Sequence, residues 1–432
     1  MTGPSYVSSA RSTPRSRHFG SFFRTRSWWG VVLLALASAV AWWMPWNFIP
    51  YGAKASPMVG VNPSHLAVVE QGVNAYWNSY WRDKGLTLTS LRVVQGSIYG
   101  IEGGHRVLAV SAKDGRVAWR RTLSQPISAP LIIAAGRILV VTKRGGSSTL
   151  LALSAASGKP LWHRRMKAES KVAYTQGQIW VVGGGKLVDR SPTTGRPVSS
   201  RSISGLARPS SLLAVGPSLY ISDRSHGQVA EYRLDLTTHR PVWRTSLGLG
   251  FRVGVATLSG STLDLPILAE RAGTLAIVAL SLKTGHMRWQ LTLGVLPAPP
   301  SKSAGAGMLV SADGTLYLAS ALTHAIYAVA PGPGRLLWQN ELGQEPLMTT
   351  PVVVANQVVV GDQTGILWDI DQKSGQVEHR VKLTGSFFPE VPFLVGRTLY
   401  VSTSGRGAEL AGVRFGRVVP SLAGGYQIGD RH

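Results

Sequence analysis

One phrase, repeated through most of the chain, constrains the fold more than any other feature of the sequence. In each copy an apolar strand leads through a short turn, closed by glycine in most copies, into a second strand that carries a tryptophan. A companion phrase, a turn residue followed by a β-rich strand, precedes each copy, as in Gly136-Arg137-Ile138-Leu139. Repetition of this kind indicates one structural unit used many times. Five copies end in tryptophan and two degenerate copies do not: Trp119, Trp162, Ser199, Trp243, Trp289, Trp338 and His379.

The spacing of the copies identifies the unit. Successive copies lie 37 to 49 residues apart, and four short strands in a unit of this length make the blade of a β-propeller. A four-stranded sheet cannot bury both faces alone, so blades must pack face to face around an axis, and a tryptophan can fill the wedge between two of them. We therefore predict an all-β chain, a β-propeller of four-stranded blades, with eight blades favoured and seven as the alternative.

The uncertain blade is the last one. Its third strand is expected near residues 410–413, and its outer strand is either residues 416–420, where Ser421 stands at the tryptophan position, or an N-terminal segment, 72–77. We favour the N-terminal segment, with Trp77 at about the right phase, because pairing the two ends of the chain removes an open sheet edge.

Composition excludes several classes of protein. With 44% hydrophobic and only 15% charged residues, the chain is not a disordered polyelectrolyte. It contains no cysteine, which excludes disulfides, cysteine nucleophiles, thiolate metal sites and lipid attachment through cysteine.

The first fifty residues read as a targeting segment. Residues 1–27 contain five arginines and no acidic residue, and a charge-free apolar run with tryptophans at both ends follows. Such a helix can cross a hydrocarbon core of about 30 Å, and the arginines favour the cytoplasmic side. We predict a basic cytoplasmic tail (1–27), a transmembrane signal-anchor helix (28–50), a linker (51–63) and an extracytoplasmic propeller (64–432). Signal cleavage at Ala39-Val40-Ala41, followed by secretion, is the alternative.

The repeat resembles the pyrroloquinoline-quinone (PQQ)-type propeller repeat. The best matches run from Leu151 to Trp162, from Leu275 to Trp289 and from Leu367 to Gly375. The resemblance implies one of two functions: a quinone-dependent dehydrogenase, or a non-enzymatic scaffold of the BamB-like branch. The alcohol dehydrogenases of this family have an adjacent cysteine pair at the cofactor, which this chain lacks, so the scaffold branch is favoured. The lipidation cysteine of BamB is also missing, and the predicted helix stands in its place.

No residues stand out as a catalytic, cofactor-binding or metal site. The histidines are scattered, and His105, His163, His239 and His286 are expected in turns or on outer strands, exposed to solvent. The segment 369–375 superficially resembles a calcium loop but has Lys373 at a ligand position. The run Gly183-Gly184-Gly185-Lys186 lacks the spacing of a phosphate-binding loop. We expect no catalytic activity and no cofactor.

The charge is the remaining functional signal. Lysine and arginine outnumber acidic residues by 45 to 21, which gives a formal charge of +24, and such a surplus attracts anionic partners. The basic residues are spread along the blades, without a discrete patch in the sequence. We predict a monomeric, membrane-anchored scaffold that binds envelope or membrane proteins and no nucleic acid. A dehydrogenase-like enzyme is one alternative, and a binder of anionic wall polymer or lipid headgroups is the other.

Overall fold

The computed structural model describes most of the chain after residue 76. The described residues are 77–84, 88–167, 170–225, 227–296, 300–301, 305–354, 356–387, 392–395, 398–405 and 409–415, and all belong to the unit Trp46–His432. The predicted tail, transmembrane helix and linker (1–63) lie outside them and stay predictions. None of the described residues forms a helix long and apolar enough to cross a membrane.

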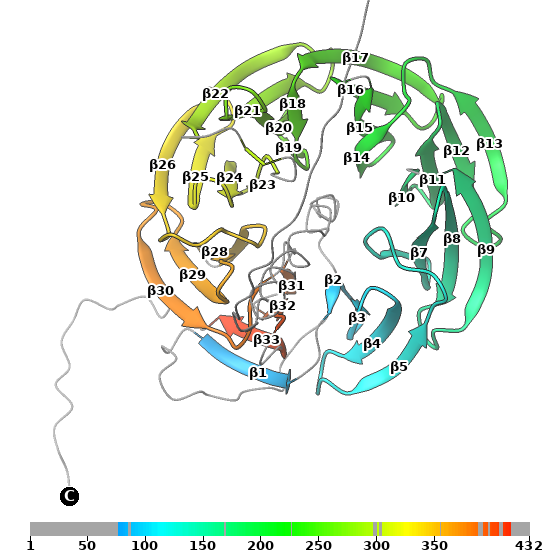
Figure 1. The fold of residues 1–432 in the computed structure, drawn as a ribbon, viewed down its shortest axis with the longest axis horizontal. Coiled ribbons are helices and arrows are strands. Elements are labelled where there is room, and N and C mark those ends of the chain that lie inside the picture. The colour runs from blue at the N-terminus through cyan, green and yellow to red at the C-terminus, as the bar shows by residue number, and fades with distance from the viewer. Residues whose placement is uncertain are drawn as a thin grey trace, which may run out of the picture. The chain divides into compact units, whose positions relative to one another are not determined.

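The described residues form 33 β-strands arranged in eight sheets, so the prediction of eight blades is confirmed and the alternative of seven is wrong (Figure 1). The strands of blades 1 to 4 are β2 (Thr89–Val94), β3 (Ser97–Glu102), β4 (Arg106–Ser111), β5 (Val117–Thr122); β6 (Ile132–Ala134), β7 (Arg137–Arg144), β8 (Ser147–Ser154), β9 (Pro160–Lys167); β10 (Lys171–Thr175), β11 (Gln178–Gly183), β12 (Lys186–Arg190), β13 (Pro197–Ser202); and β14 (Pro209–Val215), β15 (Ser218–Ser225), β16 (Gln228–Asp235), β17 (Arg240–Leu249). Those of blades 5 to 8 are β18 (Phe251–Val253), β19 (Thr257–Ser259), β20 (Thr262–Ala269), β21 (Thr274–Ser281), β22 (Met287–Val295); β23 (Met308–Ala312), β24 (Thr315–Ser320), β25 (Ala325–Ala330), β26 (Arg335–Glu341); β27 (Val352–Val354), β28 (Gln357–Gly361), β29 (Ile366–Asp371), β30 (Val377–Lys382); and β31 (Phe393–Val395), β32 (Thr398–Ser402), β33 (Glu409–Phe415), β1 (Trp77–Lys84).

Each blade is an antiparallel meander whose strands, here called a to d, run from the centre of the ring to its periphery (Figure 1). In blade 5 the inner strand is divided into β18 and β19, and both pair with β20. Because neighbouring strands alternate in direction, the turns between strands b and c leave from the same rim as the connections to the next blade. We call this rim the bc rim, and the opposite one, which carries the ab and cd turns, the cd rim.

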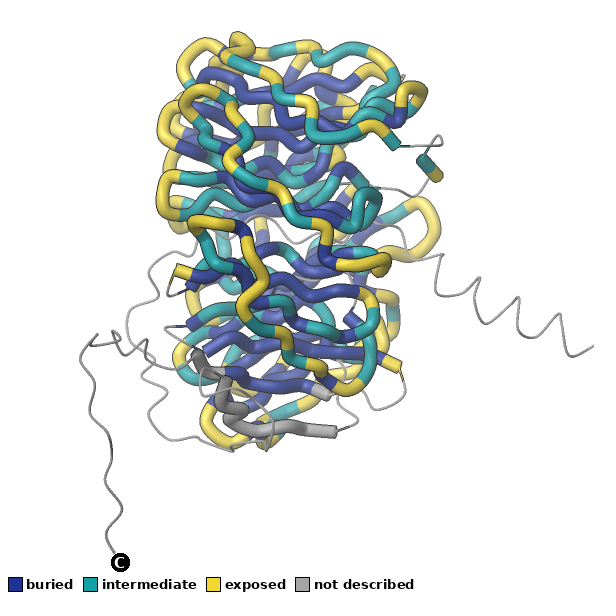
Figure 2. Tube along the Cα trace, turned by 90° about the vertical axis from the view of Figure 1, so that its left-hand side faces the viewer, coloured by how far each residue is buried: buried dark blue, intermediate teal, exposed yellow. Residues whose placement is uncertain are grey.

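Apolar side chains are buried at every joint between neighbouring blades, including the joint between blades 8 and 1. The middle strands are almost wholly buried, whereas turns and outer strands carry the exposed residues (Figure 2). Burial of apolar area stabilises each joint. The core is therefore a ring of eight inter-blade layers.

The tryptophans of the repeat connect each blade to the next. The ring of Trp119 on β5 lies against Gly158 in the cd turn of blade 2, so close that a Cβ on this glycine would be 2.5 Å from Cε3 of the ring. Trp119 Nε1 also donates a hydrogen bond of 3.0 Å to the Ala155 carbonyl in the same turn. The same packing recurs at four further pairs: Trp162 with Gly195, Trp243 with Gly285, Trp289 with Gly334 and Trp338 with Gly375. The wedge role predicted for tryptophan is confirmed, and the turn glycine is its steric partner.

The joint between blades 3 and 4 replaces this pair with two polar residues. Ser199 stands at the tryptophan position of blade 3, and His239 stands where the cd turn of blade 4 should have glycine. Ser199 Oγ and His239 Nδ1 are 3.2 Å apart in a hydrogen bond, and the imidazole contacts Trp180 edge-on with ring centroids 5.3 Å apart. His239 keeps the left-handed backbone of the glycine that it replaces, with φ of 57°. A larger turn residue thus fills the space that the smaller strand residue leaves.

The strand-c residue facing the tryptophan position is acidic in the two blades that lack the tryptophan. It is alanine in blades 1, 2, 5 and 6, as at Ala109 opposite Trp119, but it is Asp189 opposite Ser199 and Asp369 opposite His379. His379 Nδ1 lies 3.4 Å from Asp369 Oδ2. The two degenerate copies therefore place facing polar side chains where most other blades have tryptophan and alanine.

The N-terminal strand closes the ring, as predicted, but at a different register. β1 pairs with β33 from Trp77 opposite Phe415 to Lys84 opposite Glu409. Of the predicted strand at 72–77, Trp77 begins β1, whereas residues 72–76 lie outside the described part of the chain and stay a prediction. A bulge between Ser79 and Trp81 shifts the register so that Trp81, and not Trp77, lies opposite Gly412. The other candidate for the outer strand, 416–420, also falls outside the described residues.

Candidate functional site

Two large apolar side chains stand exposed on the bc rim of blades 4 and 5. Leu249 is 65% exposed and Val295 is 68% exposed, the highest values among the large apolar residues that the structure describes. They occupy equivalent positions, because Leu249 ends β17 and Val295 ends β22, the outer strands of neighbouring blades. The other strongly exposed apolar residues lie singly on outer strands of the blades: Leu161, Val198, Val242, Met287, Leu337 and Val377.

A β-bulge explains how these ends reach the rim. The pairing of β17 with β16 skips Leu247, and that of β22 with β21 skips Leu293. Leu247 and Leu293 pack against the buried clusters, while Leu249 and Val295 remain exposed. A bulge bends a strand and re-aims its side chains, and bulges are frequent beside functional sites.

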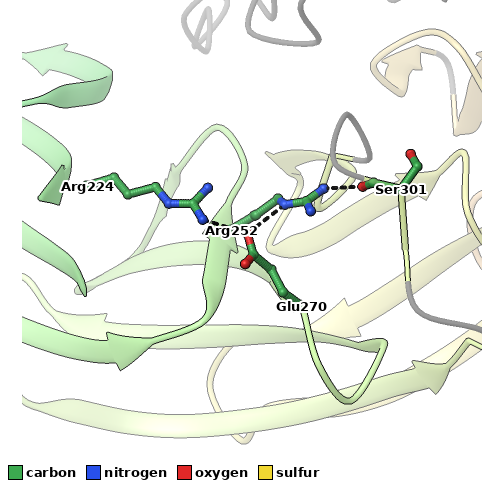
Figure 3. Close-up of polar contacts among 4 residues, drawn as sticks. All are labelled: Arg224, Arg252, Glu270 and Ser301. Atoms are coloured by element: carbon green, nitrogen blue, oxygen red, sulfur yellow. Dashed lines mark hydrogen bonds and ion pairs between the residues drawn. The ribbon is translucent and has the colours of Figure 1, made fainter. Parts of the chain in front are cut away.

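A network of two arginines and one glutamate lies on the same rim (Figure 3). Arg224 at the end of β15 donates to Glu270 Oε1 at 2.6 Å, and Arg252 on β18 donates to the same oxygen at 2.8 Å. Arg252 also donates to the Ser301 carbonyl at 2.6 Å, in the connection to blade 6. The network thus links blade 4, blade 5 and the start of the next connection.

The electrostatics of the network favour a charged carboxylate. Partial burial alone would raise the pKa of Glu270, but the hydrogen bonds and positive charges of Arg252 and Arg224 hold the pKa below its usual value. The group therefore stays ionised, and two guanidinium groups face one carboxylate. Arg271, exposed beside Glu270, adds a further positive charge.

We call Leu249, Val295, Arg224, Arg252 and Glu270 the docking rim. Protein interfaces are built from apolar or aromatic anchors with arginine enriched around them, and charged pairs at their edge fix orientation. The docking rim supplies these components on a rigid framework of β-strands. Its chemistry suits the binding of another protein.

Three of the four histidines singled out in the sequence behave as predicted. His105, His163 and His286 are exposed, on the bc turn of blade 1, on β9 and on the cd turn of blade 5. His239 is the exception, because it is half-buried and bonded to Ser199. The prediction of a solvated surface residue was wrong there, since its tryptophan-free neighbour leaves room for the imidazole.

The two segments that superficially resembled ligand-binding loops are ordinary turns. Asp371 Oδ1 accepts hydrogen bonds from the backbone and hydroxyl of Ser374, at 2.7 and 2.6 Å, and so caps its own turn. The run from Gly183 to Lys186 is the bc turn of blade 3. Within the described residues no group of three or more His, Cys, Asp and Glu side chains is placed to hold a metal ion.

Several buried carboxyl groups were not predicted. Burial, together with the charge of Asp223, raises the pKa of Glu231 to about 8, although a hydrogen bond with Ser222 opposes the shift. Burial raises the pKa of Asp264 to about 6 against hydrogen bonds from Ser259 and Thr262. Burial also raises the pKa of Asp189. Perturbed carboxyls can mark catalytic sites, but these three lie on strands of three different blades.

The sequence does contain a signal for the docking rim. Leu247-Gly248-Leu249 and Leu293-Gly294-Val295 are copies of one phrase at the same point of consecutive repeats. An aliphatic residue after such a glycine, beyond the last residue needed for the core, indicates an exposed strand end. The arginine–glutamate network has no comparable signal, because its members come from three separate strand ends.

Comparison with known proteins identifies relatives across most of the chain. Residues 70–215 and 271–419 match the family model described as outer membrane protein assembly factor BamB. The curated BamB of Legionella pneumophila is 26% identical over 319 residues, which cover 71% of this chain and 78% of the relative. BamB of Burkholderia pseudomallei is 23% identical, with 72% and 69% covered. A tetrathionate hydrolase of Acidithiobacillus ferrooxidans is 22% identical over 364 residues, with 72% and 70% covered.

Solved structures share the fold. The crystal structure of BamB from Moraxella catarrhalis superposes with a TM-score of 0.59 at 17% identity, over 78% of this chain and all of that one. A quinohemoprotein alcohol dehydrogenase from Comamonas testosteroni also gives 0.59, at 13% identity, over 87% of this chain and 83% of that one. Because the sequence identities are this low, these comparisons show only a shared propeller fold.

Proposed function

Because the chain belongs to the outer membrane protein assembly factor BamB family, we propose that it is a protein-binding scaffold of the cell envelope and not an enzyme. The observation that carries this proposal is the docking rim, where two exposed aliphatic side chains and an arginine–glutamate network lie on one rim of adjacent blades. A rigid ring with apolar anchors at one rim can hold a partner without a chemical step. The partner we propose is another envelope or membrane protein.

The test is site-specific photo-crosslinking of the full-length protein in intact cells. A benzophenone amino acid replaces Leu249 or Val295, and the matched control places it at Leu161 or Leu337, which are also exposed but lie on other blades. We expect one recurrent envelope protein, identified by mass spectrometry, from the docking-rim positions and not from the controls. Equal labelling from all four positions, or none, would overturn the proposal.

We also propose that the N-terminal segment keeps the protein in the membrane with the propeller outside the cytoplasm. This rests on the arginine-rich tail at 1–27 and the apolar run that follows it. Externally added protease should degrade the propeller in spheroplasts and leave a short membrane-bound fragment. A soluble mature protein beginning after Ala41 would support signal cleavage instead.

Two activity assays test the alternative that the protein is an enzyme. The tetrathionate hydrolase relative favours hydrolysis of tetrathionate, and the PQQ-type repeat favours quinone-dependent dye reduction. Purified full-length protein should show neither activity above a heat-treated control. Turnover of tetrathionate, or calcium-dependent dye reduction with added quinone, would replace the scaffold proposal.

A further inference from the structure

The positive charge of the propeller is concentrated in blades 1 to 3. Residues 88–208, which span these blades, contain 19 Lys and Arg against 4 Asp and Glu. Residues 305–415, which span blades 6 to 8 without the closing strand, contain 7 and 9. The basic residues are spread along the blades, as expected, but most of the net charge lies in blades 1 to 3. One side of the ring is strongly basic and the other is close to neutral.

Within these blades the bc turns share a design of adjacent glycines. Each contains neighbouring glycines next to basic residues: Gly103-Gly104-His105-Arg106, Lys143-Arg144-Gly145-Gly146 and Gly183-Gly184-Gly185-Lys186. The basic side chains in all three are exposed, and a Cβ built on Gly104 or Gly145 would meet nothing within 4 Å. Backbone amides in such open turns are accessible to an anion alongside the cations.

Two lysines from different blades meet at the third of these turns. A Cβ on Gly184 would lie 2.5 Å from Cδ and 3.1 Å from Nζ of Lys167, so this side chain lies across the turn. Lys167 ends β9 of blade 2, whereas Lys186 begins β12 of blade 3. The side chains of Lys167 and Lys186, from neighbouring blades, therefore both lie at this glycine turn.

In the described part of the bc turns of blades 2 and 3, no carboxylate pairs with the basic side chains. Among the residues that the structure describes, Lys143, Arg144 and Lys186 form no ion pair, and the carboxylates that pair with blade 1 cations are Glu102 and Asp114. Like charges that face solvent without counter-ions repel one another and leave a strong local field. A bound polyanion would relieve this repulsion.

We propose that Lys143, Arg144, Lys167, Lys186 and Arg208, here called the basic rim, bind a linear phosphate-bearing polymer of the envelope. All five lie on the bc rim, in turns or strand ends of blades 2 and 3 and the connection to blade 4. Successive phosphates of an extended chain can contact successive turns, and lysine, arginine and backbone amides are the groups that bind phosphate. This site adjoins the docking rim, since the Arg224 N–H donates a 3.0 Å backbone hydrogen bond to the Arg208 carbonyl, and it extends the protein's function to a second class of ligand.

Two observations favour a polymer over a protein or a bilayer. The large apolar side chains exposed on the bc rim, among the described residues, are Leu249 and Val295, in blades 4 and 5, so the basic rim lacks the anchors of a protein interface. β1 begins at the cd rim, because Trp77 lies opposite Phe415 at the far end of β33. The described chain therefore enters the propeller at the rim opposite the basic rim.

The experiment measures binding of end-labelled inorganic polyphosphate to purified full-length protein by fluorescence anisotropy. The triple variant Lys143→Gln, Arg144→Gln, Lys186→Gln removes three cations from the basic rim. The matched control, Lys113→Gln, Lys159→Gln, Arg196→Gln, removes three exposed cations from the cd turns of blades 1 to 3, so the total charge is the same. One basic side chain near an anionic surface is worth about fivefold in affinity, so the rim variant should bind on the order of 100-fold more weakly.

The salt dependence gives a second readout. The slope of log affinity against log salt should fall in magnitude by about two for three lost contacts to a flexible polyanion, and it should stay unchanged in the control. Equal losses in both variants, or no loss, would overturn the proposal. Binding to phosphatidylglycerol vesicles without binding to polyphosphate would assign the rim to a bilayer instead. Crosslinks from Leu249 and Val295 should persist in the rim variant, so the two proposals fail independently.

Discussion

The contact between tryptophan and glycine, found at five of the joints, can be tested with two substitutions in a single blade. Gly158→Ala in the cd turn of blade 2 places a methyl group 2.5 Å from the ring of Trp119. Gly136→Ala in the ab turn of the same blade is the matched control, since a Cβ there meets nothing within 4 Å. Both glycines have a left-handed backbone, with φ of 67° and 73°. The variants therefore share the backbone cost and differ in the contact with tryptophan.

The expected magnitudes follow from these geometries. Alanine in the left-handed region costs about 1–2 kcal/mol, which is the whole effect expected for Gly136→Ala. For Gly158→Ala, displacement of the ring adds about 1–3 kcal/mol of overpacking, and the hydrogen bond from Trp119 Nε1 to Ala155 contributes about 1 kcal/mol more when it is lost. The two variants should differ by about 2–4 kcal/mol in the free energy of unfolding.

The assay is urea-induced unfolding of the purified full-length protein, followed by tryptophan fluorescence and circular dichroism. A double-mutant cycle with Trp119→Ala isolates the contact. In the Trp119→Ala background Gly158→Ala should cost no more than Gly136→Ala does, because the ring is absent. Equal destabilisation by the two glycine substitutions in the wild-type background would refute the proposed packing.

Three further predictions concern the buried polar groups and the closing strand. The pKa of Glu231 is raised to about 8 and that of Asp264 to about 6. The folded state therefore binds these protons more tightly than the unfolded state, so the contribution of these two groups to stability is greatest below about pH 4 and falls as pH rises toward 8, by up to about 1.4 kcal/mol per pH unit for each group. In the Glu231→Gln variant the thermal midpoint should depend less on pH between pH 6 and 8. An unchanged dependence on pH would count against the raised pKa of Glu231. In a chain carrying Asp189→Ala and Ser199→Trp, adding His239→Gly should raise the thermal midpoint by several degrees, since it rebuilds the tryptophan–glycine contact of the other blades; a fall would contradict this account. Deletion of β1 (77–84) leaves β33 as an open edge and should cause self-association detectable by light scattering, whereas an eight-residue deletion in the predicted linker (54–61) should not; a monomer in both cases would show that the edge is protected otherwise.

The sequence allowed the propeller and its blade number to be predicted because each turn and tryptophan recurs in phase. A single copy of Ser157-Gly158-Lys159 would indicate only a turn, whereas its recurrence fixes the unit. The place of the closing strand was harder to predict, because β1 stands outside the repeat and carries Trp77 and Trp81 close together. The bulge that selects Trp81 is a property of the pairing with β33, and it cannot be read from either strand alone.

The candidate sites were less accessible to sequence reasoning for a related reason. The docking rim and the basic rim consist of residues that diverge from the repeat, at strand ends that only the ring brings together. Lys167 and Lys186 belong to different blades in sequence yet share one turn. His239 is informative only once Ser199 is known to face it. Sequence periodicity reveals the residues that the blades share. The docking rim and the basic rim consist of residues that differ from the repeat, so periodicity does not reveal them.

The position of β1 also sets the order in which the molecule can be completed during synthesis. The strand that closes the last blade is made first, but its partner β33 is made last, and the buried hydrogen bond from Leu88 N–H to Ser402 Oγ joins residues 314 positions apart. Until the final blade emerges, β1 has no partner and the ring stays open at both ends. Long-range pairing of this kind is slow and leaves strand edges exposed in the meantime. A nascent chain is therefore vulnerable to proteolysis and misassociation until its last strand is made, and the loss of even a few residues of β33 would reopen the whole ring.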